Sequence, residues 1–140
     1  MVIFMSKKIL LPLDGSNRDL IAVNFLKDNF NPQETEVILL NVGEIVYVHG
    51  IVVSEIISSE KADGNEILER AFDNLKEFKC TKEFQFGYAH NVILNYANAF
   101  NVDMIIMAKN TKKNFVPFVG SVTARVIKRS KHTVIVLPQV

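Results

Sequence analysis

The stretch Asp-Met-Ile-Ile-Met-Ala-Lys-Asn-Thr-Lys-Lys-Asn (103–114), followed by Phe-Val-Pro-Phe-Val-Gly-Ser-Val-Thr (115–123), decides the fold. The apolar run 104–107 is typical of a strand buried on both faces. Gly120 and Ser121 favour a helix start, because serine is a strong N-cap and glycine lets a ligand approach the backbone. A strand that leads through a polar loop to a helix N-terminus is an arrangement that binds phosphate. The stretch therefore predicts an anion site at the end of a buried strand.

Charge is spread unevenly along the chain. From residue 104 to the end there are seven Lys and Arg and no Asp or Glu, so this segment carries +7. Residues 1–103 hold the other nine basic residues and all 15 acidic ones, which makes them −6. This bias favours an anionic ligand near the end of the chain. A solvated basic face is the alternative, since charge runs alone are weak evidence.

Length and composition indicate one ordinary globular domain. The 140 residues can bury a sizeable core, and 49% of them are hydrophobic against 22% charged. A net charge of +1 gives no overall attraction to nucleic acid or to acidic membranes. The single cysteine, Cys80, excludes an intramolecular disulfide, and the histidines lack metal-ligand spacing. We find no signal peptide and no uncharged run near the roughly 18 residues of a membrane span. We therefore expect a cytoplasmic protein without a membrane partner.

The first half of the chain predicts two strands and a helix. Residues 8–13 form the first strand, with Pro12 at the end where pairing stops. Asp14 or Ser16 then caps a helix, and residues 36–42 form the clearest buried strand. The apolar side of that helix consists of Ile21, Ala22, Phe25, Leu26 and Phe30.

Residues 43–59 allow several structures. They contain two apolar runs around His49 and Gly50, which could form a hairpin, although this pair is a weak turn signal. A lid or a dimer-contact flap with partial helix is equally compatible with them.

The second half continues the alternation of helices and strands. Residues 63–66 (Asp-Gly-Asn-Glu) resemble a capping box that starts a helix, and Cys80 follows that helix as an inert filler. A short strand is expected at 83–86, a longer one at 103–108 and the last at Thr133–Leu137. The helix faces expected to be buried are Ile67, Leu68, Ala71, Phe72, Leu75 and Phe78; then Val92, Ile93, Tyr96, Ala97 and Phe100; and finally Val122, Val126 and Ile127.

This order predicts a single α/β domain over residues 1–140. Strands that alternate with amphipathic helices form an open five-stranded parallel sheet with helices on both faces, a Rossmann-like arrangement. Ligands bind such sheets at the carboxyl ends of the strands, where the strand order reverses. If the first strand lies beside the fourth, residues 12–14 and 107–114 face each other there, and Gly120 and Ser121 close the crevice from the far side.

Four segments together resemble the universal stress protein family over nearly the whole chain. They are Lys-Lys-Ile-Leu-Leu-Pro-Leu-Asp-Gly-Ser (7–16), the block 87–107, Gly-Ser-Val-Thr-Ala-Arg-Val-Ile (120–127) and Thr-Val-Ile-Val-Leu-Pro (133–138). The resemblance implies an adenine-nucleotide α-hydrolase-like fold and a stress-response regulator or signalling module. It further implies ATP as ligand, with or without Mg²⁺, and a homodimer joined through Thr133–Leu137, open to an unidentified protein partner. We expect no enzyme, with slow ATP hydrolysis left open.

The resemblance also assigns a nucleotide site. By analogy, Asp14 and Val42 lie near adenine and ribose. The whole expected set is Pro12, Leu13, Asp14, Val42, Met107, Ala108, Asn110, Thr111, Lys112, Gly120, Ser121 and Val122. Within this set, Pro12 and Met107 flank the base, and Asn110, Thr111, Gly120, Ser121 and Val122 line the phosphates.

The glycine motif of the nucleotide-binding members is altered in this chain. Those members carry Gly-x-x-Gly, nine residues, then Gly-Ser or Gly-Thr. Ala108 and Thr111 replace the first two glycines here, and only eight residues separate Thr111 from Gly120. Each replacement costs on the order of 1–2 kcal/mol where φ is positive, or roughly ten-fold in affinity. Lys109, Lys112 and Lys113 supply charge in compensation.

Three other functions compete with nucleotide binding. A family member that has lost its nucleotide would act as a dimeric interaction module. Ser16, His90 and Asp14 offer the residue types of a hydrolytic triad, but no nucleophile-elbow sequence accompanies them. Nucleic-acid binding through residues 109–131 is unlikely, because that stretch has only Phe115 and Phe118 as aromatics and no recognised motif. Neither a Gly-x-x-x-x-Gly-Lys-Ser/Thr loop nor a Gly-x-Gly-x-x-Gly loop is present.

Overall fold

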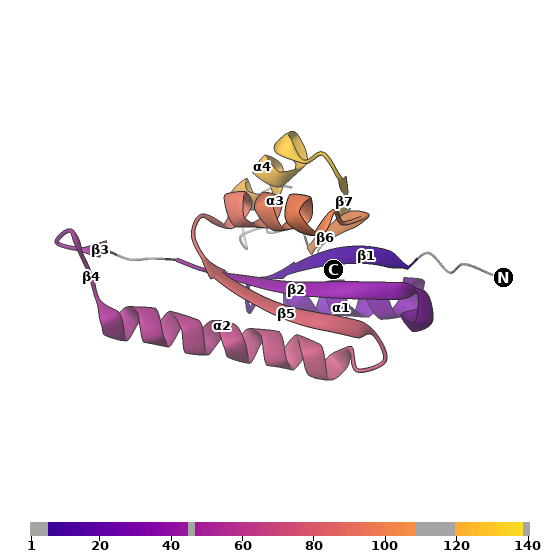
Figure 1. The fold of residues 1–140 in the computed structure, drawn as a ribbon, viewed down its shortest axis with the longest axis horizontal. Coiled ribbons are helices and arrows are strands. Elements are labelled where there is room, and N and C mark those ends of the chain that lie inside the picture. The colour runs from indigo at the N-terminus through magenta and orange to yellow at the C-terminus, as the bar shows by residue number, and fades with distance from the viewer. Residues whose placement is uncertain (1–5, 45–46, 109–119, 139–140) are drawn as a thin grey trace.

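A parallel sheet of five strands lies at the centre of the protein (Figure 1). The computed structural model describes residues 6–44, 47–108 and 120–138. The strands are β1 (Lys7–Leu13), β2 (Thr35–Gly43), β5 (Lys79–Phe86), β6 (Met104–Ala108) and β7 (Thr133–Leu137). Their order in the sheet is β5-β2-β1-β6-β7, and every pairing is parallel. The predicted sheet is therefore confirmed, with the first strand beside the one at 104–108.

Two helices cover each face of the sheet. Helices α1 (Arg18–Asn29) and α2 (Ser54–Asn74) lie on one face, and α3 (Ala89–Phe100) and α4 (Ser121–Arg129) on the other (Figure 1). Successive residues of β1 divide between the two faces, since Ile9 and Leu11 pack with α1 and α2 while Leu10 packs with α3 and α4. This double cover explains why the central strands read as continuous apolar runs.

A small hairpin follows β2. It consists of β3 (Tyr47–Val48) and β4 (Ile51–Val52), joined by His49 at φ 51° and Gly50 at φ 77°. Two consecutive positive φ values are the mark of the tight turn that suits the twist of paired strands. The hairpin expected around these residues is thus confirmed. Because α2 starts at Ser54, the partial helix considered for the same stretch is also present.

The expected start of α2 at residues 63–66 is wrong. These residues lie inside a helix of 21 residues that begins nine positions earlier, at Ser54. Gly64 is buried in that helix, and a Cβ there would lie 2.2 Å from Cε2 of Phe84 and 2.6 Å from Oδ1 of Asn41. The glycine therefore serves close packing of α2 against β2 and β5 rather than a helix start.

Other local expectations need smaller corrections. The N-cap of α1 is Asn17 rather than Asp14 or Ser16, and that of α4 is Gly120 rather than Ser121. Strand β5 begins at Lys79 instead of residue 83, so Cys80 lies inside it, half-buried. Burial raises the pKa of the Cys80 thiol to about 11, which keeps it protonated at neutral pH.

The buried side of α4 also differs from the expected one. Thr123 and Val126 are buried, whereas Ile127 is 47% exposed. The helix is short and lies near the edge of the sheet, so its apolar residues are covered on one side only. None of the helices in the described residues is long and apolar enough to cross a membrane.

Candidate functional site

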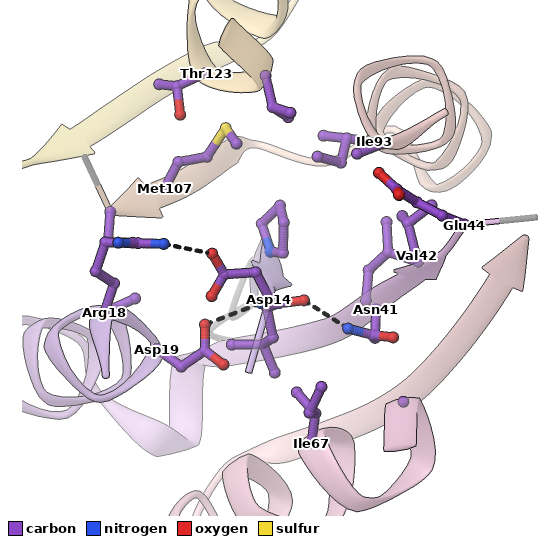
Figure 2. Close-up of a pocket in the computed structure, with 18 of the residues that line it drawn as sticks. Asp14, Arg18, Asp19, Asn41, Val42, Glu44, Ile67, Ile93, Met107 and Thr123 are labelled. Carbon is purple, nitrogen blue, oxygen red and sulfur yellow. Dashed lines mark hydrogen bonds and ion pairs between the residues drawn. The ribbon is translucent and has the colours of Figure 1, made fainter. Parts of the chain in front are cut away.

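A cavity of about 470 Å³ opens at the carboxyl ends of β1, β2 and β6 (Figure 2). The chain leaves β1 toward β2 over one face of the sheet and reaches β6 through α3 on the other face. The strand order thus reverses between β1 and β6, where open parallel sheets bind ligands. Registered pairing of these two strands is limited to Ile9 with Met104 and Leu10 with Ile105. Pro12 follows that pairing and has no N–H to donate, as predicted, so the strand ends stand apart around the cavity.

Strands and helices from both layers contribute to the walls. The strand ends supply Pro12, Leu13, Asp14, Leu40, Asn41, Val42, Met107 and Ala108, with Glu44 just after β2. The helices supply Arg18, Asp19 and Ala22 from α1, Glu60, Asp63, Gly64 and Ile67 from α2, Ala89 and Ile93 from α3, and Val122 and Thr123 from α4. The floor is apolar and the rim is polar, as is usual for small-molecule sites.

Asp14 ends the first strand and is held by three donors. Ser16 donates its backbone N–H and its hydroxyl to Oδ1 at 2.9 and 2.5 Å, and Nη2 of Arg18 donates to Oδ2 at 3.0 Å. Burial alone would raise the pKa of Asp14, but these hydrogen bonds and the positive charge of Arg18 outweigh it and leave the pKa below its ordinary value. Asp14 is therefore an ionised, well-oriented acceptor at the mouth of the cavity.

Asp19 stabilises the same turn from the helix. Its carboxylate accepts the backbone N–H groups of Asp14 at 3.1 Å and Gly15 at 2.8 Å, where Gly15 has φ 84° (Figure 2). Burial raises the pKa of Asp19 to about 6, and the neighbouring charge of Asp14 acts in the same direction. The turn after β1 thus depends on a carboxylate that titrates slightly below neutral pH.

Asn41 joins two strand ends below the cavity. Its Nδ2 donates to the carbonyl oxygen of Leu13 at 2.8 Å, and the residue is only 6% exposed. A polar residue inside the otherwise apolar run of β2 was a visible signal for such a role, which sequence reasoning missed. The bond holds the ends of β1 and β2 at a defined separation.

The described part of the expected site falls into two groups. Seven expected residues line the cavity: Pro12, Leu13, Asp14, Val42, Met107, Ala108 and Val122. Gly120 and Ser121 start α4 beside it but do not line it, and Gly120 has φ −55°, which any residue can adopt. The expectations on Lys109, Asn110, Thr111, Lys112 and Lys113, including the spacing to Gly120, lie outside the described residues.

The charge of the described walls differs from the one expected for an anion site. Five carboxylates line the cavity, from Asp14, Asp19, Glu44, Glu60 and Asp63, against the single basic side chain of Arg18. The basic residues of α4, Arg125, Lys128 and Arg129, are exposed and do not line it. Within the described ranges, no three His, Cys, Asp or Glu side chains come together as a metal site. The walls on the α2 side are therefore better acceptors of hydrogen bonds than binders of anions.

The hydrolytic triad considered from sequence does not form in this part of the chain. The hydroxyl of Ser16 donates to Asp14 directly, and none of the hydrogen bonds between described residues joins His90 to either of them. Desolvation and the charges of Arg125 and Arg129 lower the pKa of His90, so the histidine faces α4.

Comparison with known proteins gives a consistent result over the whole chain. The sequence profile of the universal stress protein family matches residues 5–138. Universal stress protein MJ0577 of Methanocaldococcus jannaschii is 31% identical over 154 aligned residues, which cover 95% of each chain. Its solved structure matches with a TM-score of 0.68 at 32% identity, covering 97% of this chain and 98% of that one.

Other solved structures share the fold. Hypothetical protein PH0823 is 26% identical with a TM-score of 0.75, over 96% of this chain and 97% of that one. A universal stress protein in complex with cAMP is 20% identical with a TM-score of 0.71, over 96% of this chain and 98% of that one. Two further relatives, at 16% and 19% identity, were solved with AMP in the protein from Arabidopsis thaliana and with dAMP in the one from Archaeoglobus fulgidus.

Proposed function

Since the chain belongs to the universal stress protein family, we propose that its cavity binds an adenine nucleotide and that the protein acts as a nucleotide-responsive stress-signalling module in the cytoplasm. The observation that carries the proposal is the cavity at the reversal of strand order. Asp14, Val42 and Met107 line it from three neighbouring strands. Relatives of the same fold hold cAMP, AMP and dAMP, and this supports adenine as the base.

The cavity has the features that an adenosine group needs. Apolar side chains of Pro12, Ile93 and Met107 offer contact to a flat base, and the ionised Asp14 offers an acceptor to ribose hydroxyls. ATP, with or without Mg²⁺, is the finer form of the proposal. It requires binding groups for three phosphates near the start of α4, where helix N–H donors are available.

Binding without catalysis is the second part of the proposal. The described walls hold carboxylates and one arginine but no nucleophile paired with a general base, so we propose a binding protein rather than an enzyme. We further propose a homodimer through β7, which is the edge strand of the sheet and strongly apolar. Pairing with the same strand of a second copy would cover this edge and form a two-fold interface.

One observation favours a competing function. Ala108 and Thr111 replace two glycines of the family motif, which fits a dimeric interaction module without nucleotide. Mass spectrometry of small molecules released by acid from fresh protein, followed by calorimetric titration with AMP and Mg-ATP, separates the two. We expect saturable binding of at least one nucleotide, with no ADP formed from ATP. A flat titration with both nucleotides at millimolar concentration would leave only the interaction module.

A further inference from the structure

Arg18 is the only basic side chain in the described walls of the cavity. It stands in the first turn of α1, and 22% of its side chain is exposed. Its one hydrogen bond to the described residues joins Nη2 to Oδ2 of Asp14 at 3.0 Å. A guanidinium has five N–H donors in a planar fork, so this bond leaves donors for a ligand. Arg18 can therefore bind an anion in the cavity while it stays paired with Asp14.

Carboxylates line the far side of the cavity. We call Glu44, Glu60 and Asp63 the carboxylate wall; Glu60 and Asp63 are three residues apart and so share one face of α2. Figure 2 shows Arg18 and Glu44 on opposite sides of the space, with Asp14 between them. Between described residues the ion pairs are Arg18 with Asp14 and Lys82 with Glu69, so no member of the wall is neutralised there. The wall accepts hydrogen bonds and repels phosphate.

We propose that Arg18 binds the phosphate of the ligand, and that the carboxylate wall faces its nucleoside end, so that the cavity selects a nucleoside monophosphate. The inference rests on the proposed function and adds to it a residue, an orientation and a ligand class. A phosphate near Arg18 also lies on the side of Met107 and Thr123, where α4 begins (Figure 2). The ribose hydroxyls and the amino group of the base, which are donors, then point toward the acceptors of the wall.

The same arrangement limits the number of phosphates. One guanidinium fork matches one phosphate group, with two parallel N–H···O bonds. Each further phosphate adds negative charge to a space that already holds five carboxylates and a single arginine. In the absence of Mg²⁺, affinity therefore falls from AMP to ATP.

A purely structural role of Arg18 makes a different prediction. An exposed or partly exposed pair between residues four apart contributes little to stability, and its loss affects every ligand alike. A contact to phosphate affects AMP and leaves adenosine unchanged, because adenosine has the same base and ribose but no phosphate. The comparison of these two ligands isolates the contact.

The experiment is calorimetric titration of adenosine, AMP and ATP in EDTA, with the parent protein and three variants. Arg18→Gln should weaken AMP binding about ten-fold or more and change adenosine binding less than two-fold. Arg18→Lys keeps the charge without the fork, so its AMP affinity should lie between those of the parent and Arg18→Gln. The matched control is Lys27→Gln, which removes one positive charge from the last turn of the same helix, away from the cavity. It should change neither affinity, and thermal unfolding checks that each variant is folded.

Several results would overturn the inference. An equal loss of adenosine and AMP affinity in Arg18→Gln would give Arg18 only a structural role in the turn. Unchanged AMP binding would remove it from the site, and tighter binding of ATP than of AMP to the parent in EDTA would reject the monophosphate class. In each of these cases the parent still binds nucleotide and the proposed function stands. If the parent binds none of the three ligands, the proposed function fails and the inference fails with it.

Discussion

Replacing Gly64 by alanine should destabilise the protein although it improves the helix. In an ordinary helix interior this change stabilises by about 1 kcal/mol, because glycine has the greater backbone freedom in the unfolded chain. The new Cβ, however, would lie 2.2 Å and 2.5 Å from two ring carbons of Phe84 and 2.6 Å from Oδ1 of Asn41. Overpacking of a filled core costs about 1–3 kcal/mol. The ring of Phe84 cannot turn away freely, since it packs edge-on against Phe86 with centroids 5.0 Å apart. We expect a net loss of about 1 kcal/mol.

Urea unfolding of three variants tests this reasoning. Ala62→Gly, at an exposed position of the same helix, measures the helix term alone and should cost about 1 kcal/mol. Phe84→Leu removes the ring that the new methyl group meets, so Gly64→Ala should become neutral or stabilising in that background. If Gly64→Ala stabilises the parent by about 1 kcal/mol, the close contact between α2 and the sheet is not as described and the reasoning is wrong.

Three further predictions concern charge and assembly. Because the folded pKa of Asp19 is raised from 3.8 to about 6, the folded state holds this proton more tightly than the unfolded chain. Its contribution to the free energy of unfolding thus declines between pH 4 and pH 6, on the order of 2 kcal/mol, and Asp19→Asn should abolish that decline in urea titrations. Glu60→Gln should raise ATP affinity in EDTA about three-fold more than AMP affinity, the effect of one charge at ~6 Å in water. Glu66→Gln, on the same helix but outside the cavity, should leave this ratio unchanged in calorimetry. Ile135→Asp in β7 should convert a dimer into a folded monomer in sedimentation, with circular dichroism as the folding control; an intact dimer would count against pairing through β7.

The arrangement of the sheet could be predicted from sequence because burial leaves a clear pattern. The runs at 37–40 and 104–107 are apolar without interruption, since helices cover both faces of the sheet. Alternation with amphipathic helices then allows few topologies, and the one with β1 beside β6 places a site at their carboxyl ends. For this reason Asp14, Val42 and Met107 were found without a structure.

Helix boundaries and helix-borne site residues could not be predicted in the same way. A polar residue followed by Glu is typical of a helix start, yet Asp63 and Glu66 lie in the interior of α2. Asp63 faces the cavity there, and nothing in its sequence neighbourhood separates it from a solvated surface residue. Arg18 and Glu60 look equally ordinary, because only the packing of their helices on the sheet brings them to one space. Their roles are a consequence of the fold and leave no local pattern.

The most direct test of nucleotide binding at the reversal of strand order is a crystal structure of the protein grown with millimolar AMP. The account predicts density for AMP in the cavity, with the adenine between Val42 and Met107, the ribose next to Asp14 and the phosphate within hydrogen-bond distance of Arg18. An empty cavity at saturating AMP, or AMP bound at another place on the protein, would contradict it.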